Sequence, residues 1–233
     1  MKAFKKIIAM VLVVASILFC LAGCKKNKTS TSANDKTSTG VTSPLDKYTE
    51  DTSTEKKDYY YVAMAVKDHG VMILKLNAAQ APKTVANFVK LVREDFYDGL
   101  TFHRVISGFM IQGGDPQANG QGGSSEKIEG EFLANGYPNT IRHEKGVISM
   151  ARLGNDMNSA TSQFFICNAT NSSVSSLNGQ YAAFGHVIEG IEVVDSITSA
   201  TAKYGNSSNG TIDVKSYQAV ITEMKVIEYT EAN

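Results

Sequence analysis

Eight short segments after residue 58 are rich in β-branched and aromatic residues, and loops containing glycine or asparagine separate most of them. Segments of this length and composition predict β-strands, here at residues 59–66, 71–76, 101–105, 109–112, 146–150, 163–166, 182–186 and 219–229. Only two segments have helical periodicity, one that begins at Pro82 and one at residues 191–199. Because strands and helices do not alternate regularly, the sequence argues against a parallel α/β sheet and predicts a mainly β fold, a closed antiparallel barrel.

The N-terminus has a different composition. Three lysines at positions 2, 5 and 6 precede an uncharged apolar run from residue 7 to residue 23, the pattern of an export signal. The run ends in Leu21-Ala22-Gly23-Cys24, which resembles the lipobox of bacterial lipoproteins. This resemblance implies cleavage before Cys24 and lipidation of Cys24, and hence a lipid-anchored protein on the extracytoplasmic face of a bacterial cell membrane. An ordinary signal or an uncleaved anchor with a chance cysteine is the alternative.

The next segment is polar. Residues 25–58 contain 13 Ser or Thr among 34 residues, one aromatic residue, Tyr48, and no apolar periodicity. Such a segment cannot bury enough apolar surface to offset its ordering entropy. We therefore divide the chain into a signal peptide at residues 1–23, a lipidated Cys24 with a flexible tether to residue 58, and a folded domain at residues 59–233.

Charge and motif spacing exclude several classes of function. The 23 basic residues equal the 23 acidic residues, so we expect no nucleic-acid partner. The glycine-rich stretch 113–123 lacks the ending of a phosphate-binding loop, and the four histidines lack the spacing of zinc ligands. We expect neither a metal nor a cofactor. Cys167 lies in an apolar run, and we expect a small buried residue there and not a nucleophile.

Several segments form a specific series. They read Pro-Lys-Thr-Val-Ala-Asn-Phe at 82–88, Thr-Phe-His-Arg-Val-Ile at 101–106, Gly-Phe-Met-Ile-Gln-Gly-Gly-Asp at 108–115, Gly-Val-Ile-Ser-Met-Ala at 146–151, Ser-Gln-Phe-Phe-Ile at 162–166 and Leu-Asn-Gly-Gln-Tyr-Ala-Ala-Phe-Gly at 177–185. In this order and spacing they closely resemble the cyclophilin family of peptidyl-prolyl isomerases. The resemblance implies an eight-stranded antiparallel barrel capped by two helices, and rotation about X–Pro bonds as the reaction.

The resemblance also implies site residues. It assigns catalysis to Arg104, Gln112 and Phe109, and contacts with the proline-containing polypeptide to Met110, Ala151, Gln163, Phe165, Leu177 and Tyr181. Considered one at a time, Phe109 and Phe165 could be ordinary core residues, and Arg104 could form a surface ion pair. The presence of the complete set favours their assignment to the active site. We expect His103 to support its strand, because the reaction transfers no proton.

Three positions depart from the family's common pattern. Ser176 stands where eukaryotic members often carry Trp, Tyr181 where many carry His, and Arg152 where Asn is common. The missing Trp puts tight cyclosporin binding in doubt more than isomerisation. We expect a monomeric enzyme acting on exported polypeptides. The alternatives are a non-catalytic module of the same fold that binds proline-containing segments or an envelope partner, and an adhesin or scaffold that binds no proline peptide.

Overall fold

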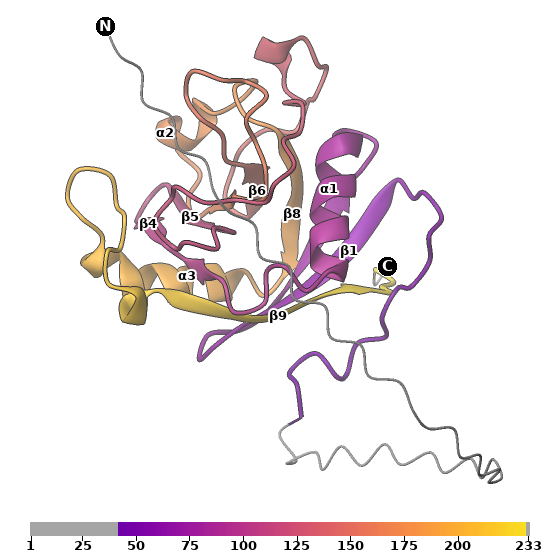
Figure 1. The fold of residues 1–233 in the computed structure, drawn as a ribbon, viewed down its shortest axis with the longest axis horizontal. Coiled ribbons are helices and arrows are strands. Elements are labelled where there is room, and N and C mark those ends of the chain that lie inside the picture. Colours follow the sequence, from indigo (N-terminus) through magenta and orange to yellow (C-terminus); the bar gives the residue numbers. More distant parts are fainter. Residues whose placement is uncertain (1–41, 232–233) are drawn as a thin grey trace, which may run out of the picture. The chain divides into compact units, whose positions relative to one another are not determined.

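The computed structural model describes residues 42–231, and its strands form one antiparallel sheet (Figure 1). The strands are β1 Tyr59–Val66, β2 Gly70–Asn77, β3 Thr101–Phe102, β4 Arg104–Ile106, β5 Met110–Gly113, β6 Val147–Met150, β7 Phe164–Cys167, β8 Ala183–Glu189 and β9 Ala219–Ile227. Each of the eight predicted strands is therefore present, with bounds that differ by a few residues at most.

The sheet closes on itself through one bent segment. The strand order is β3-β9-β1-β2-β8-β6-β7-β5-β4, so β3 and β4 lie at its two edges, yet only His103 separates them in the chain. The first half of this segment pairs with β9 and the second half with β5. The two edges are thereby joined into a nearly closed barrel, which confirms the predicted fold. The bend divides one expected strand in two, so the structure contains nine strands where eight were expected.

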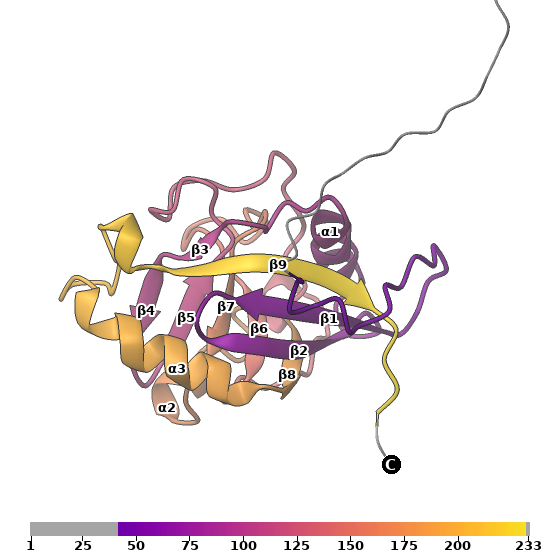
Figure 2. The same cartoon turned by 90° about the horizontal axis from the view of Figure 1, so that it is seen from below.

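Three α-helices accompany the barrel, α1 Pro82–Arg93, α2 Ser172–Ser175 and α3 Ile191–Thr201, together with three short 3-10 helices at Leu133–Asn135, Ala202–Tyr204 and Lys215–Tyr217. The two longer helices confirm the predicted pair, and Figure 2 shows them on different sides of the barrel. The one-turn helix α2 was not expected, and it forms because the Asn171 side chain accepts a hydrogen bond from the Val174 amide.

The start of α1 is capped from a distant part of the chain. Pro82 occupies the first turn, where its missing N–H has no cost, but Ala81 offers no capping side chain. The buried carboxylate of Glu131 instead accepts hydrogen bonds from the amides of Lys83 and Thr84, at 2.9 and 2.8 Å. A carboxylate at this end also interacts favourably with the helix dipole, so Glu131 fixes α1 to the loop that precedes β6.

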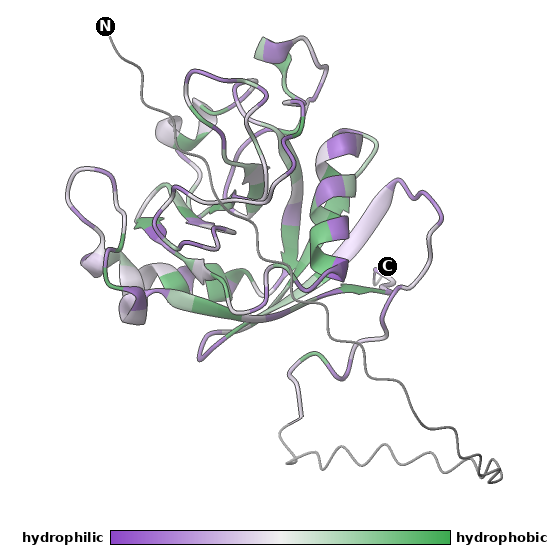
Figure 3. Cartoon of the chain, viewed as in Figure 1, coloured by the Kyte–Doolittle hydropathy of each residue, from purple (hydrophilic) through white to green (hydrophobic). Residues whose placement is uncertain are grey.

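The barrel interior is filled by apolar side chains from alternate strand positions and from one face each of α1 and α3. Phe88 of α1 lies against Tyr97, Phe164 and Phe184, with ring centroids 4.9, 5.5 and 5.2 Å away. Figure 3 shows the hydrophobic colour on β9 and alternating with hydrophilic residues along α1. Because inward positions are apolar, the residues between them on β4, β5 and β7 face the outside of the barrel.

The predicted boundary between tether and domain at residue 58 is wrong. Leu45 is fully buried, in a cluster on the outer face of β1 and β2 that also includes Tyr48. The Asp51 amide donates to the Val226 carbonyl at 2.9 Å, and the Arg93 guanidinium donates to the carbonyls of Asp51 and Ser53. The domain therefore extends at least from residue 42, because two apolar side chains and backbone hydrogen bonds hold this polar segment against the barrel.

The predicted signal peptide, Cys24 and the tether up to residue 41 lie outside the described residues. Among residues 42–231, no helix has both the length and the apolar character that crossing a membrane requires.

Candidate active site

The strand register brings the predicted site residues into one row. Arg104 on β4 pairs with Gln112 on β5, and Gln112 pairs with Phe165 on β7. Directly paired residues of neighbouring strands lie on the same face of a sheet. A second row on this face joins Met110 of β5 to Cys167 of β7. Phe165 therefore packs on the outer wall of the barrel, in a small cluster of buried residues separate from the main core.

These rows form one wall of a cavity of about 310 Å³. The cavity is lined by Arg104, Phe109, Met110, Gln112, Ala151, Arg152, Phe165, Leu177 and Tyr181. Six of the nine lining residues are apolar or aromatic, and Arg104, Gln112 and Arg152 supply polar groups. Apolar side chains with a few polar groups among them are the usual lining of a small binding site.

Arg104 is held at two of its three nitrogens. Its Nε donates to the Asn209 carbonyl at 2.7 Å, and its Nη1 donates to Gln112 Oε1 at 3.0 Å. Within the part of the chain that the structure describes, Nη2 makes no hydrogen bond and the side chain forms no ion pair, so the surface ion-pair alternative is wrong. Partial burial lowers the pKa of Arg104, but an arginine stays charged at neutral pH.

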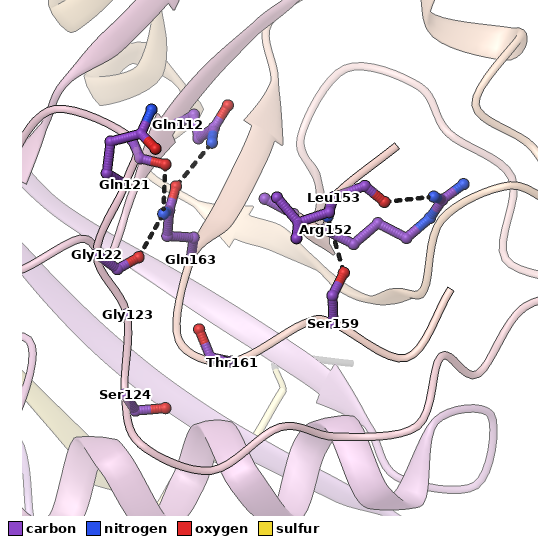
Figure 4. Close-up of a pocket in the computed structure, with 12 residues that line it drawn as sticks. Gln112, Gln121, Gly122, Gly123, Ser124, Arg152, Leu153, Ser159, Thr161 and Gln163 are labelled. Carbon is purple, nitrogen blue, oxygen red and sulfur yellow. Dashed lines mark hydrogen bonds between the residues drawn. The ribbon is translucent and has the colours of Figure 1, made fainter. Parts of the chain in front are cut away.

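Gln112 and Gln163 continue this network. Gln112 Nε2 donates to Gln163 Oε1 at 2.9 Å, and Gln163 Nε2 donates to the carbonyls of Gly122 and Gly120 at 2.6 and 3.2 Å, as Figure 4 shows for Gly122. Because both amide hydrogens of Gln163 point to carbonyls, its oxygen must accept from Gln112. The oxygen of Gln112 is thereby left to accept from Arg104, so each amide has one defined orientation.

A second cavity of about 300 Å³ adjoins the first and shares Gln112, Ala151 and Arg152 with it (Figure 4). The remaining residues that line it are 120–124, Leu153, Ser159, Thr161 and Gln163, most of which are glycine or polar residues. Ala151 lines both cavities, whereas Gln163 lines only the second. Together the cavities have the form of a groove that can hold an extended peptide.

Two aromatic rings pack against Phe165 beside the first cavity. Phe165 is 5% exposed and lies between Tyr181, in an edge-to-face contact at 5.7 Å, and the ring of His143, stacked at 6.0 Å. His143 Nε2 lies 3.0 Å from the Ser149 hydroxyl, and burial lowers the pKa of His143. A neutral His143 therefore supports Phe165 from behind. Burial also raises the pKa of the Cys167 thiol to about 12, which makes Cys167 an inert packing residue.

The sequence predicted nine residues for catalysis or for contact with the substrate. Eight of them line the first cavity, and the ninth, Gln163, lines the adjoining one. Sequence reasoning missed two participants. Arg152 lines both cavities, but its guanidinium lies 4.7 Å from the Tyr181 ring and donates to the Gln180 carbonyl at 3.2 Å. Asn209 contributes only its backbone carbonyl, a group that every residue type carries, so no sequence signal could identify it.

Comparison with known proteins identifies the family to which this barrel and groove belong. Residues 61–226 match the family described as cyclophilin type peptidyl-prolyl cis-trans isomerase/CLD. The chain therefore belongs to this family and is a peptidyl-prolyl cis-trans isomerase.

Individual relatives agree with this assignment. The peptidyl-prolyl cis-trans isomerase cyp18 of Streptomyces antibioticus is 42% identical over 163 residues, which cover 68% of this chain and 93% of the relative. Peptidyl-prolyl cis-trans isomerase B of Bacillus subtilis is 43% identical over 134 residues, covering 58% and 87%. A Cryptosporidium parvum cyclophilin-type isomerase, crystallised in the presence of the dipeptide Ala-Pro, is similar with a TM-score of 0.61 at 29% identity, covering 72% of this chain and 99% of that one.

Proposed function

We propose that this isomerase is anchored by a lipid on Cys24 at the extracytoplasmic face of a bacterial membrane, where it assists the folding of exported proteins. The proposal is supported by the basic start, the uncharged apolar run and the Leu-Ala-Gly-Cys sequence at residues 21–24. Exported chains cross the membrane unfolded and contain X–Pro bonds whose isomerisation is slow, so an isomerase at that surface meets its substrates as they emerge.

We propose Arg104 as the residue that stabilises the transition state. Rotation about the X–Pro amide has a barrier of about 18–20 kcal/mol, because the nitrogen lone pair is delocalised into the carbonyl. In the twisted transition state the lone pair is localised on the prolyl nitrogen. A hydrogen-bond donor aimed at that nitrogen therefore binds the transition state more tightly than the planar ground state.

The observation that carries this role is the state of the Arg104 guanidinium. Two of its nitrogens are held by Asn209 and Gln112, while Nη2 is left without a hydrogen bond among the described residues, on a half-buried side chain that lines the first cavity. A charged donor in a partly dry site is stronger than in water. Gln112 keeps one amide hydrogen for the substrate backbone, and Phe109, Phe165 and the other apolar lining residues are suited to the proline ring.

The role of Arg104 is tested by the Arg104→Ala variant in a protease-coupled assay on an X–Pro peptide. Loss of one charge-assisted hydrogen bond, worth about 1.5–3 kcal/mol, should lower kcat about ten- to a hundredfold with little change in KM. Arg142→Ala is the matched control, because Arg142 is exposed and lines neither cavity. Equal rates for the wild type and Arg104→Ala would refute the role. A wild type that binds the peptide without accelerating isomerisation would support the binding-module alternative.

The anchor is tested separately by labelling cells with radioactive palmitate. Label on the wild type and none on Cys24→Ala would support lipidation at Cys24, and label retained on the variant would exclude that site. Protease added to intact spheroplasts should digest the protein if it faces outward, while resistance would contradict the proposed location. We also propose that the enzyme is a monomer, and a dimer in sedimentation equilibrium would contradict this.

A further inference from the structure

The loop at residues 205–212, between the end of α3 and β9, lies against β4 beside Arg104. Two backbone hydrogen bonds, which together form an antiparallel bridge, attach it there. The Val105 amide donates to the Gly210 carbonyl at 3.0 Å, the Ile212 amide donates to the His103 carbonyl at 2.8 Å, and a bridge pairs Arg104 with Thr211. The loop is therefore attached on both sides of the residue whose side chain enters the cavity.

The loop also keeps its own shape. The Oδ1 atom of Asn206 accepts hydrogen bonds from the amides of Ser208 and Asn209, at 2.9 and 3.2 Å, and from the Ser208 hydroxyl at 2.7 Å. In the backbone, the N–H of Asn206 donates to the carbonyl of Thr211, and the N–H of Gly210 donates to the carbonyl of Asn206. A loop closed by so many internal bonds holds its exposed carbonyl groups in fixed positions.

One of those carbonyls, that of Asn209, accepts the 2.7 Å hydrogen bond from Arg104 Nε. The five N–H groups of a guanidinium lie in one plane. Fixing Nε on Asn209 and Nη1 on Gln112 therefore fixes the plane and leaves only small movements for Nη2. Without the Asn209 contact, the side chain could rotate about its bond to Gln112, and a shift of about 1 Å in a catalytic group can cost about a hundredfold in rate.

We infer that loop 205–212 positions Arg104 for catalysis, with Gly210 and Asn206 as the positioning residues that place the Asn209 carbonyl. Gly210 has φ of +78°, and a Cβ there would overlap the Ile106 side chain and come within 3.0 Å of the Val105 carbonyl. A side chain at Gly210 therefore requires the loop or the Ile106 side chain to shift, in addition to the strain of the positive φ. Gly99 has the same φ of +78° with no atom within 4 Å of a Cβ, which makes it a matched control for backbone strain.

The test compares Gly210→Ala with Gly99→Ala, and Asn206→Ala with Asn206→Asp, in the same isomerase assay. Gly210→Ala should lower kcat at least about tenfold at a KM within about twofold of the wild type, while Gly99→Ala keeps the wild-type kcat. Asn206→Ala should lower kcat by a smaller factor, and Asn206→Asp, which retains an acceptor oxygen, should restore it.

A direct readout is proton exchange at the arginine Nε–H groups, measured by NMR on the chain, which contains four arginines. Arg104→Lys identifies the Arg104 signal. Exchange at that signal should be slow in the wild type and faster in Gly210→Ala, since the Asn209 carbonyl no longer accepts the bond. A folded Gly210→Ala variant with the wild-type kcat and slow exchange would overturn the inference. If Gly210→Ala does not fold, the same two measurements are made on Asn206→Ala and Asn206→Asp, and a wild-type kcat with slow exchange in Asn206→Ala would overturn it.

This positioning role rests on the role proposed above for Arg104, and the two fail separately. If Arg104→Ala is as active as the wild type, the catalytic role of Arg104 is wrong. If Arg104→Ala has lost activity while folded Gly210→Ala and Asn206→Ala are fully active, only the positioning role is wrong.

Discussion

Replacing Leu45 with alanine tests whether the polar segment before β1 belongs to the folded domain. Leu45 is fully buried on the outer face of the barrel, in a cluster with Ala63, Ala65, Ile73 and Ile227. A flexible tether would place this side chain in water, where its removal has almost no effect on stability. The structure instead predicts a clear loss.

The magnitude follows from the atoms removed. Leucine to alanine deletes three carbon atoms, and at about 0.8 kcal/mol for each buried methylene the transfer contribution is about 2.4 kcal/mol. A rigid cavity would add to this, since buried Leu→Ala changes cost about 2–5 kcal/mol. The cluster is small and at the surface, so the segment can move inward and close most of the cavity. We expect a loss of about 2–3 kcal/mol, equivalent to about 4–12 °C in Tm for a domain of this size.

The assay is urea unfolding of residues 42–233, with isomerase activity measured on the same samples. Leu45→Ala should lower the free energy of unfolding while kcat stays unchanged, because the cluster shares no residue with the two cavities. Leu133→Ala is the control, since Leu133 is 67% exposed. A chain beginning at residue 59 should be less stable still, because it also loses the bonds from Arg93 to the segment. Equal stability of chains beginning at residues 42 and 59 would refute the reasoning.

Three further predictions concern the cap, the cavity wall and pH. Glu131→Ala leaves two backbone amides at the start of α1 without a partner and should cost about 1–3 kcal/mol in urea unfolding, whereas Glu129→Ala, at an exposed position, should cost little. Phe165→Ala enlarges the first cavity, where we propose that the proline ring binds, and should reduce kcat/KM about ten- to a hundredfold, with unchanged activity contradicting its place in the site. Burial lowers the pKa of His143 from 6.5, because the folded protein disfavours the charged ring. The contribution of the neutral ring to the free energy of unfolding is therefore fully present above pH 6.5 and decreases as the pH falls below that value. His143→Gln should therefore show a smaller drop in unfolding free energy between about pH 7.5 and 5.5 than the wild type, and an equal drop would contradict this.

The elements that carry a local pattern could be predicted from the sequence. Strands such as β1 and β9 are runs of β-branched and aromatic residues, and α3 carries its apolar residues at helical spacing. The residues that line the two cavities could be predicted because short motifs, such as that around Arg104, occur in a recognisable order along the chain. The boundary at residue 58 was wrong because Leu45 and Tyr48 are two isolated apolar residues in a polar segment, and two residues define no periodicity.

Only the tertiary structure shows which distant groups hold the helix α1 and the Arg104 side chain in place. Glu131 caps a helix that begins 49 residues earlier, at Pro82, and the carbonyl of Asn209 anchors the guanidinium of Arg104, 105 residues away. Composition and spacing report local backbone preference and burial, so they determined the strands, the helices and the types of side chain in the site. Contacts between distant backbone groups depend on the path of the chain through space, because every residue carries a carbonyl and only the fold determines which one faces the arginine.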